Sequence, residues 1–366
     1  MKIIVLGAGA IGCWIGAQLA RAEHSVTLVG RAPLVQAITE RGLQVQFVDG
    51  SQWQLDDLHA TTTLSHALLR DTAALILCMK AYAMPQAIAD LMPFAPDLQQ
   101  AYFVCFQNGF GTDDLLVQAF GSDRVIAATT TTPVSIVAPG VIRVERLDGG
   151  IGLALVSRGQ SIERREEEAE RRAQWAADVF CSLLSALSPL LYPDYRAMRW
   201  SKLLLNVIGN ASGAILDMPP AQLFANSRLF QLEMRMLREI LAVMRTQHIA
   251  VIDLPGYPAR MLARTVRWLP DALLQMLLAK RFARGRGDKR PSFYYDVVNP
   301  NPAQHSEVEW LNGAVVRAGA ACGVPTPVNA VLRQVLMDIV SGQADPSKWR
   351  GNAVALLDKV AKENAS

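Results

Sequence analysis

The sequence predicts an α/β protein, with an N-terminal Rossmann-type, doubly wound sheet followed by an all-helical C-terminal domain. Three observations support this prediction. Short β-rich runs alternate with helical patterns early in the chain, a glycine motif joins the first run to the first helix, and the second half is helical almost to its end. At 366 residues the chain is long enough for two domains. A composition change near "LYPDYRA" places the domains at 1–192 and 193–366.

Five short β-rich runs are expected to form the parallel strands, namely residues 2–6, 25–30, 74–80, 101–109 and 124–132. Helical stretches separate the first of them, and this alternation is typical of a doubly wound sheet. The first helix follows the glycine motif and runs through Ala22. Residues 140–156, "GVIRVERLDGGIGLALV", indicate a late antiparallel addition, and the dense charges of residues 158–174 indicate the start of an exposed helix.

The composition narrows the function classes. A net charge of +3 gives no argument for a nucleic-acid partner, and 51% hydrophobic residues indicate a folded globular chain. The five cysteines form no CxxC pair and the five histidines lack ligand-like spacing, so we expect no metal site and no disulfide framework. We find no apolar run of about 18 residues and no convincing signal peptide, so we expect a cytoplasmic protein without a membrane partner.

The glycine motif predicts a dinucleotide site. Gly7, Gly9 and Gly12 form G-x-G-x-x-G directly after the first strand. The first glycine permits the tight turn, the second allows a pyrophosphate to approach, and the third lets the helix pack on the strand. The helix then begins at Ala10 and Ile11, whose backbone N–H groups are available to phosphates.

The end of the second strand favours NADP(H) over NAD(H). An NAD site usually places an acidic residue there to bind the ribose 2′-hydroxyl. This chain has Arg31 instead, and it has no carboxylate from Ser25 to Ala37. Arg31 can pair with a 2′-phosphate, although a solvated surface arginine is the simpler alternative.

Two further polar residues follow predicted strands. Lys80 follows "LILCM" and Asn108 follows "AYFVCFQ". Open α/β sheets bind their ligands at the carboxyl ends of strands, so both are candidate cofactor-binding residues. The simpler alternatives are a solvated strand end for Lys80 and a turn for Asn108.

Three polar residues occur in the apolar helical run at 199–216. Lys202, Asn206 and Asn210 are each four residues apart, and steps of four advance only ~40° around a helix. They are therefore expected on one face, where they either satisfy buried partners or line a cavity. A desolvated ammonium at such a cavity could stabilise a developing negative charge and supply a proton. The structural alternative is a Lys202 paired with a buried acid and asparagines that cap helix ends.

The chain resembles ketopantoate reductase (2-dehydropantoate 2-reductase) over nearly its whole length. The resemblance rests on "GAGAIG", Arg31, "MKAY" at 79–82, "QNG" at 107–109, "KLLLNVIGN" at 202–210 and "SEVEWLNGAVVRAGAACGVPTPVN" at 306–329. It implies an oxidoreductase that reduces 2-dehydropantoate with NADPH. Other 2-oxo acids, branched or bulkier, are the alternative substrates, and an NADP(H)-binding regulatory protein without catalysis is the alternative class.

The resemblance also implies residue roles. Lys202 matches the catalytic lysine and Glu307 a carboxylate that holds the substrate hydroxyl. Asn206, Asn210 and Ser292 match substrate-binding residues, and Asn108 matches an asparagine between cofactor and substrate. The spacing between Ser292 and Glu307 is longer than in the family, stretched by residues 299–304, so Glu309 is the alternative to Glu307.

A basic segment at residues 258–290 departs from the shortest family members. It holds nine Lys or Arg against two Asp, a charge of +7, so the rest of the chain sums to −4. Its pattern predicts two short amphipathic helices separated by Pro270. We expect a lid beside the substrate site, and an anionic membrane surface is the alternative. The apolar faces of the helical half also allow a homodimer.

Overall fold

The computed structural model describes residues 1–156, 187–285, 290–299 and 305–363, and they form two compact units. The sheet unit comprises Met1–Gln107, Thr112–Met198 and Leu254–Tyr257. The helical unit comprises Asn108–Gly111, Arg199–Asp253 and Pro258–Ser366. Each unit therefore includes a four-residue loop from the sequence region of the other. The expected charged helix at 158–174 lies outside the described residues, as does most of the 299–304 insertion.

The sheet unit contains an eight-stranded sheet in the order β12-β11-β8-β7-β6-β1-β2-β5. Its strands are β1 (Lys2–Leu6), β2 (Ser25–Val29), β5 (His59–Thr61), β6 (Ala74–Leu77), β7 (Tyr102–Cys105), β8 (Val125–Thr130), β11 (Ile151–Leu155) and β12 (Leu190–Leu191). Six neighbouring strands, in the order β5-β2-β1-β6-β7-β8, run parallel, and β11 pairs antiparallel with β8. All five predicted parallel strands are present, and the Rossmann-type fold class is confirmed.

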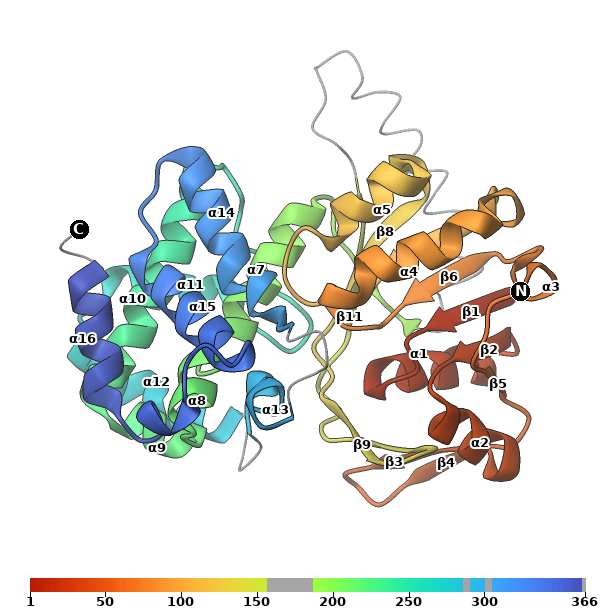
Figure 1. The fold of residues 1–366 in the computed structure, drawn as a ribbon, viewed down its shortest axis with the longest axis horizontal. Helices are drawn as coiled ribbons and strands as arrows, with labels where there is room; N and C mark the ends of the chain where they lie inside the picture. Colours follow the sequence, from red (N-terminus) through yellow and green to blue (C-terminus); the bar gives the residue numbers. More distant parts are fainter. Residues whose placement is uncertain (157–186, 286–289, 300–304, 364–366) are drawn as a thin grey trace, which may run out of the picture. The chain divides into compact units, whose positions relative to one another are not determined.

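Helices cover both faces of this sheet (Figure 1). They are α1 (Ala10–Arg21), α2 (Ala32–Arg41), α3 (His66–Leu69), α4 (Met84–Leu91) and α5 (Thr112–Phe120). Short 3₁₀ turns lie at η1 (Ala81–Ala83), η2 (Met92–Leu98) and η3 (Ser122–Arg124). Strands β1 and β6 are almost wholly buried and rich in Ile, Leu and Val, as expected for strands covered on both faces.

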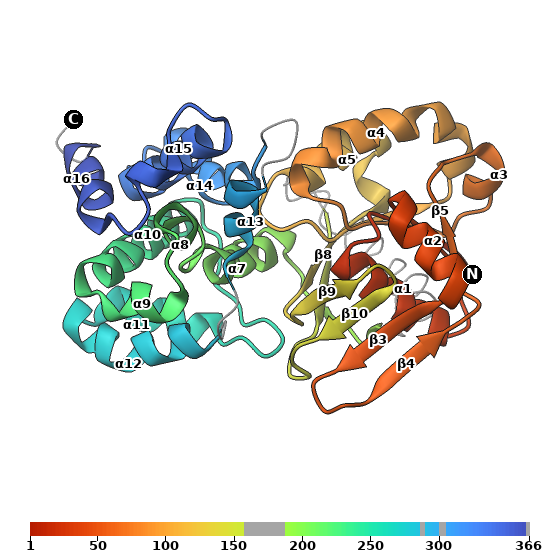
Figure 2. The same ribbon diagram turned by 60° about the horizontal axis from the view of Figure 1, so that its bottom comes forward.

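A second, four-stranded sheet packs against the other side of α1 (Figure 2). Its order is β4-β3-β10-β9, with strands β3 (Leu43–Phe47), β4 (Gln52–Leu55), β9 (Val134–Ala138) and β10 (Val141–Val144). Trp14 of α1 stacks on Trp53 and meets the edge of Phe47. The sequence analysis missed β3 and β4. The antiparallel addition that it predicted at 140–156 is confirmed for β11, which pairs antiparallel with β8, whereas β10 belongs to the second sheet. Residues 145–150 connect β10 of the second sheet to β11 of the main sheet.

The helical unit is built around the 20-residue helix α10 (Ser227–Thr246), whose buried face contacts six other helices. The remaining helices are α7 (Tyr195–Val207), α8 (Ala211–Leu216), α9 (Pro220–Ala225), α11 (Ala259–Trp268), α12 (Asp271–Gly285), α13 (Ser292–Val298), α14 (Asn312–Cys322), α15 (Pro327–Val340) and α16 (Ala353–Glu363). Two 3₁₀ turns lie at η7 (Glu307–Glu309) and η8 (Pro346–Lys348). In the described ranges every helix is too short or too polar to cross a lipid bilayer.

The described part of the basic segment forms the two expected helices, α11 and α12, joined at Pro270 (Figure 2). Leu274 and Leu278 of α12 are buried and the helix packs closely on α9, while Leu273 and Leu277 are exposed. The expected apolar stripe is therefore only half used for packing. Residues 286–289 lie outside the described chain.

Candidate cofactor and substrate sites

Two of the three motif glycines, Gly7 and Gly12, leave no room for a side chain, and the third, Gly9, faces open space. Gly7 has a φ of +87°, and a Cβ there would lie 2.4 Å from the backbone nitrogen of Met79. A Cβ on Gly12 would lie 2.4 Å from the carbonyl oxygen of Gly7. A Cβ on Gly9 would meet nothing within 4 Å, so this side of the loop is open. The loop thus has a tight turn, a close helix–strand contact and an unobstructed approach.

The N-terminus of α1 fits the phosphates of a dinucleotide. Gly9 is the N-cap residue and offers no side-chain cap, and the first turn holds no acidic residue. The first N–H groups of a helix lack intrahelical partners, so those of Ala10 and Ile11 remain available for phosphate oxygens. The Cys13 thiol of α1 donates to the carbonyl oxygen of Ala8 in the loop (3.6 Å), and burial raises the pKa of this thiol to about 12.

Arg31 lies next to the glycine loop. It is the N-cap residue of α2 and is exposed, and a Cβ on its neighbour Gly30 would lie 3.0 Å from the Cβ of Ala8. Among the described residues no carboxylate pairs with its guanidinium. A cation at this position can bind an additional phosphate on the ribose.

The carboxyl ends of β6 and β7 are joined by a buried amide. Gln107 donates from Nε2 to the carbonyl oxygen of Met79 (3.1 Å), and its Oε1 accepts from Cys105 Sγ (2.7 Å). Lys80 follows Met79 directly and is exposed. The sequence analysis placed Lys80 at a strand end but gave no role to Gln107, which fixes the backbone beside Gly7.

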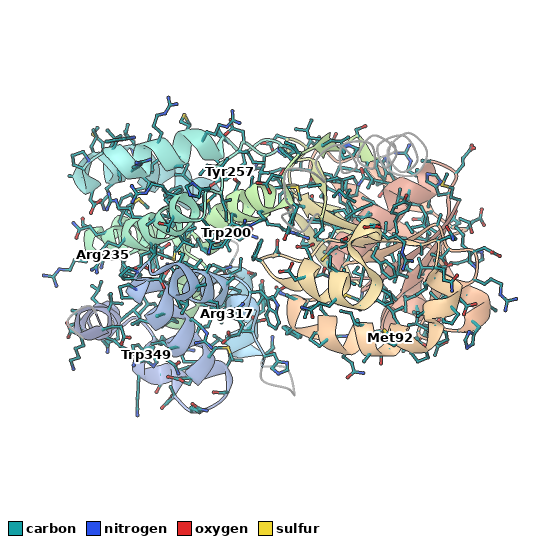
Figure 3. All side chains as sticks on the ribbon, turned by 90° about the horizontal axis from the view of Figure 1, so that it is seen from above. Met92, Trp200, Arg235, Tyr257, Arg317 and Trp349 are labelled. Carbon is teal, nitrogen blue, oxygen red and sulfur yellow. The ribbon has the colours of Figure 1, made fainter. Side chains whose placement is uncertain are left out.

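Asn108 to Gly111 leave the sheet unit and attach to the helical unit. The N–H of Phe110 donates to the carbonyl oxygen of Trp310 (2.9 Å), and the Phe110 ring lies 5.7 Å from that of Trp200. Trp200 is fully buried inside the helical unit (Figure 3). Gly109 has a φ of +89°, and a Cβ there would lie 2.2 Å from the Trp310 carbonyl oxygen. The turn at "NG" (108–109) therefore needs a glycine at its second position, and it brings Asn108 within hydrogen-bond distance of Asn206.

Lys202 and Asn206 lie one turn apart on α7. Lys202 is 9% exposed, within a helix whose neighbours Leu203 and Leu204 are fully buried. Asn206 donates from Nδ2 to Oδ1 of Asn108 (2.9 Å). The structure therefore brings together two of the amides that the sequence analysis proposed from separate motifs.

Asn210 does not share this helical face, so that prediction was wrong. α7 ends at Val207, and α8 begins only at Ala211. Gly209 has a φ of +60°, and its N–H donates to Oε2 of the fully buried Glu233 (2.7 Å). Glu233 also accepts from Ser212 Oγ, so one carboxylate fixes both sides of the break. The glycine in "VIGN" was the available signal for this turn.

The four hydrogen-bonding positions of the Asn210 amide are all used within the protein. Its Oδ1 accepts from the N–H of Phe293 (3.1 Å) and from Ser292 Oγ (3.2 Å). Its Nδ2 donates to the Asn206 carbonyl oxygen (3.0 Å) and lies 3.1 Å from Ser292 Oγ. Asn210 thus caps the start of α13, and Ser292 keeps an exposed position.

The two candidate glutamates lie in different surroundings. Glu307 is 5% exposed and begins η7, where Ser306 provides the cap and donates to Asp296 (2.8 Å). Glu309 is committed to ion pairs with Arg333 (2.9 Å) and Arg317 (3.6 Å). This favours Glu307 over the alternative. The described residues contain no group of three or more His, Cys, Asp or Glu arranged to hold a metal.

Comparison with known proteins gives consistent matches. Residues 3–157 match the family profile described as "Ketopantoate reductase PanE/ApbA", and residues 194–340 match its C-terminal counterpart. A 2-dehydropantoate 2-reductase from Pyrococcus abyssi is 26% identical over 332 residues, covering 91% of this chain and 95% of the relative. One from Lactococcus lactis is 23% identical over 339 residues, covering 92% and 97%.

Solved structures show the same fold. A ketopantoate reductase of the PanE/ApbA family from Ralstonia eutropha is 25% identical with a TM-score of 0.71, covering 94% of this chain and 99% of the other. A ternary structure of D-mandelate dehydrogenase with NADH and anilino(oxo)acetate is 21% identical with a TM-score of 0.69, covering 93% and 99%.

Proposed function

Because the chain belongs to the ketopantoate reductase family, we propose that it is an NADPH-dependent reductase of a 2-oxo acid, with 2-dehydropantoate as its substrate. The 2-dehydropantoate 2-reductases that match over more than nine-tenths of this chain support this substrate class.

The observation that carries the proposal is the polar group on α7. Lys202, a residue that is only 9% exposed, lies one helical turn from Asn206, whose side-chain amide donates to Asn108. We propose that Lys202 donates a proton to the substrate ketone oxygen and stabilises the developing alkoxide. When bound, the reduced nicotinamide supplies the hydride that adds to the carbonyl carbon.

We assign the remaining side chains to binding. Asn108 and Asn206 orient the substrate, and Ser292, held by Asn210, binds the substrate carboxylate. Glu307 accepts a hydrogen bond from the substrate hydroxyl. An amide is suited to such a site because it donates and accepts without neutralising the lysine.

For the cofactor we propose NADP(H), held by Gly7, Gly9, Gly12 and the first N–H groups of α1. Support comes from Arg31 and from the absence of any carboxylate between Ser25 and Ala37. Lys80 provides a second cation at the same sheet edge. Because the D-mandelate dehydrogenase of similar fold is recorded with NADH, the test must include both cofactors.

The experiment is a turnover assay that follows the nicotinamide absorbance with NADPH or NADH and a panel of 2-oxo acids. We expect the highest kcat/KM with 2-dehydropantoate and NADPH. A higher value with a bulkier acid would support the alternative substrate class. Tight NADPH binding with no turnover of any acid would support a non-catalytic binding protein.

A further inference from the structure

Helices α10 and α11 of the helical unit enclose a groove with a cavity of about 500 Å³. Pockets that hold small organic ligands have volumes of roughly 300–1,000 Å³. Aliphatic side chains such as Leu241 and Val251 line one part of it, and four arginines with Trp268 line the rest. None of the residues proposed above to touch substrate or cofactor lines this groove.

One of the four arginines has a structural role. Arg238 donates to the carbonyl oxygen of Val266 (3.1 Å) and to the carboxylate of Asp271 (2.6 Å). It closes the C-terminal end of α11 and joins that end to the start of α12. Its charge is therefore largely compensated by the protein.

The other three arginines have no such compensation. Arg245, Arg264 and Arg267 are exposed, and no carboxylate among the described residues pairs with them. No residue that lines the groove is acidic. Arg245 and Arg267 lie in the last turns of their helices, where the helix dipole favours a cation. That reason does not apply to Arg264, and three guanidiniums on one groove repel one another unless an anion lies between them.

Trp268 adds an apolar, planar surface to this cationic groove. It is 71% exposed, although an indole ring normally contributes to a core or an interface, and the guanidinium of Arg267 lies 5.1 Å from its ring centre. Guanidinium groups bind phosphate oxygens through paired N–H donors, and an exposed indole stacks on planar rings.

We propose that the α10–α11 groove is a second ligand site, which binds an organic phosphate carrying a planar ring. Arg264 and Arg267 hold the phosphate together with Arg245, and the Trp268 indole stacks on the ring. The mixed lining of the groove suits such a ligand, because the arginines can bind the phosphate and the aliphatic side chains can contact the apolar part of the ligand.

Riboflavin 5′-phosphate is a suitable probe because stacking on an indole quenches flavin fluorescence, and riboflavin offers the same ring without the phosphate. Titrations use the full chain without added nucleotide, because NADP⁺ is itself a phosphate with planar rings and would compete for the groove. The groove variants separate this site from the α1 site, since none of the changed residues belongs to the sheet unit, which holds the glycine loop. We expect riboflavin 5′-phosphate to bind at least about tenfold more tightly than riboflavin, since charge-assisted bonds are lost without the phosphate. Arg264→Glu combined with Arg267→Glu should weaken it about tenfold or more, and Trp268→Ala should reduce the quenching.

The matched control is Arg228→Glu combined with Arg235→Glu, which makes the same charge change on α10 outside the groove. Both arginines are exposed, and Figure 3 shows Arg235 at the surface of the helical unit. The control should bind the probe like the wild type. Equal binding of the probe by the groove variant and the wild type would overturn the proposal. So would arginine-dependent sedimentation with phosphatidylglycerol vesicles in the absence of probe binding, because the groove would then face a membrane.

Discussion

Replacing Asn210 by Ala should destabilise the protein more than the loss of an ordinary helix cap does. The amide is 2% exposed and makes hydrogen bonds to the backbone of Phe293 and Asn206 and to Ser292. Loss of a cap costs about 1 kcal/mol. The Asn206 carbonyl would also lose its partner, at about 1–3 kcal/mol for an unsatisfied group. We therefore expect a decrease of about 2–4 kcal/mol in the free energy of unfolding.

The assay is urea denaturation monitored by far-UV circular dichroism, with Asn226→Ala as the control. Asn226 caps α10 through the N–H groups of Arg228 and Leu229, but it is exposed, so its loss should cost only about 1 kcal/mol. An Asn210→Ala variant that is as stable as the control or more stable, with a raised KM, would refute the reasoning. Asn210 would then be a substrate ligand first and a structural residue second.

Three further changes have defined outcomes. Arg31→Asp should weaken NADPH binding by about 2 kcal/mol, because a charge-assisted pair with the 2′-phosphate becomes a repulsion, and it should leave NADH binding unchanged or improved. Calorimetric titration with both cofactors measures this, and an equal loss of affinity for both would contradict it. Gly109→Ala should lower the thermal midpoint strongly, because of the φ of +89° and the contact with the Trp310 carbonyl, whereas an unchanged midpoint would be inconsistent with that turn. Burial raises the pKa of Cys13 to about 12 from an ordinary 9.0, so only the unfolded chain ionises this thiol between those values. Stability is unaffected below pH 9 and falls as the pH rises towards 12, by up to about 1.4 kcal/mol per pH unit for this group, and Cys13→Ala should reduce that slope in urea titrations.

The parts of the fold that depend on local patterns could be predicted from the sequence. The parallel strands, the glycine loop and the break at Pro270 follow from β-rich runs, glycine spacing and a missing N–H, all of which act within a few residues. Strands β3 and β4 carry the same kind of local signal, because "LQVQF" and "QWQL" alternate apolar and polar residues around the turn "VDGS", but the sequence analysis missed them. Their place in a separate sheet could not be predicted in this way, because it depends on Trp14 of α1 contacting Phe47 and Trp53, a contact between distant segments.

The candidate site also contains residues whose placement follows from local patterns and residues whose placement depends on distant parts of the chain. Lys202 and Asn206 were placed on one face by helical periodicity alone. The break before Asn210 depends on the buried Glu233, which lies more than twenty residues further along the chain. Part of the motif at 306–329 is structural, because Asn312 donates to Asn329 (3.0 Å) and Asn329 donates to Glu239 (2.7 Å). Sequence similarity alone does not separate such core residues from those that touch a ligand.

The most direct test of the proposed function is the oxidation of NADPH by 2-dehydropantoate, measured side by side for the wild type and Lys202→Ala, with NADPH affinity determined for both. We predict that the wild type turns over, that the variant loses about 10²-fold or more in kcat, and that both bind NADPH equally well, as expected when a general acid is lost. A variant with near-normal turnover, or a wild type that binds NADPH but reduces no 2-oxo acid, would contradict the role assigned to Lys202.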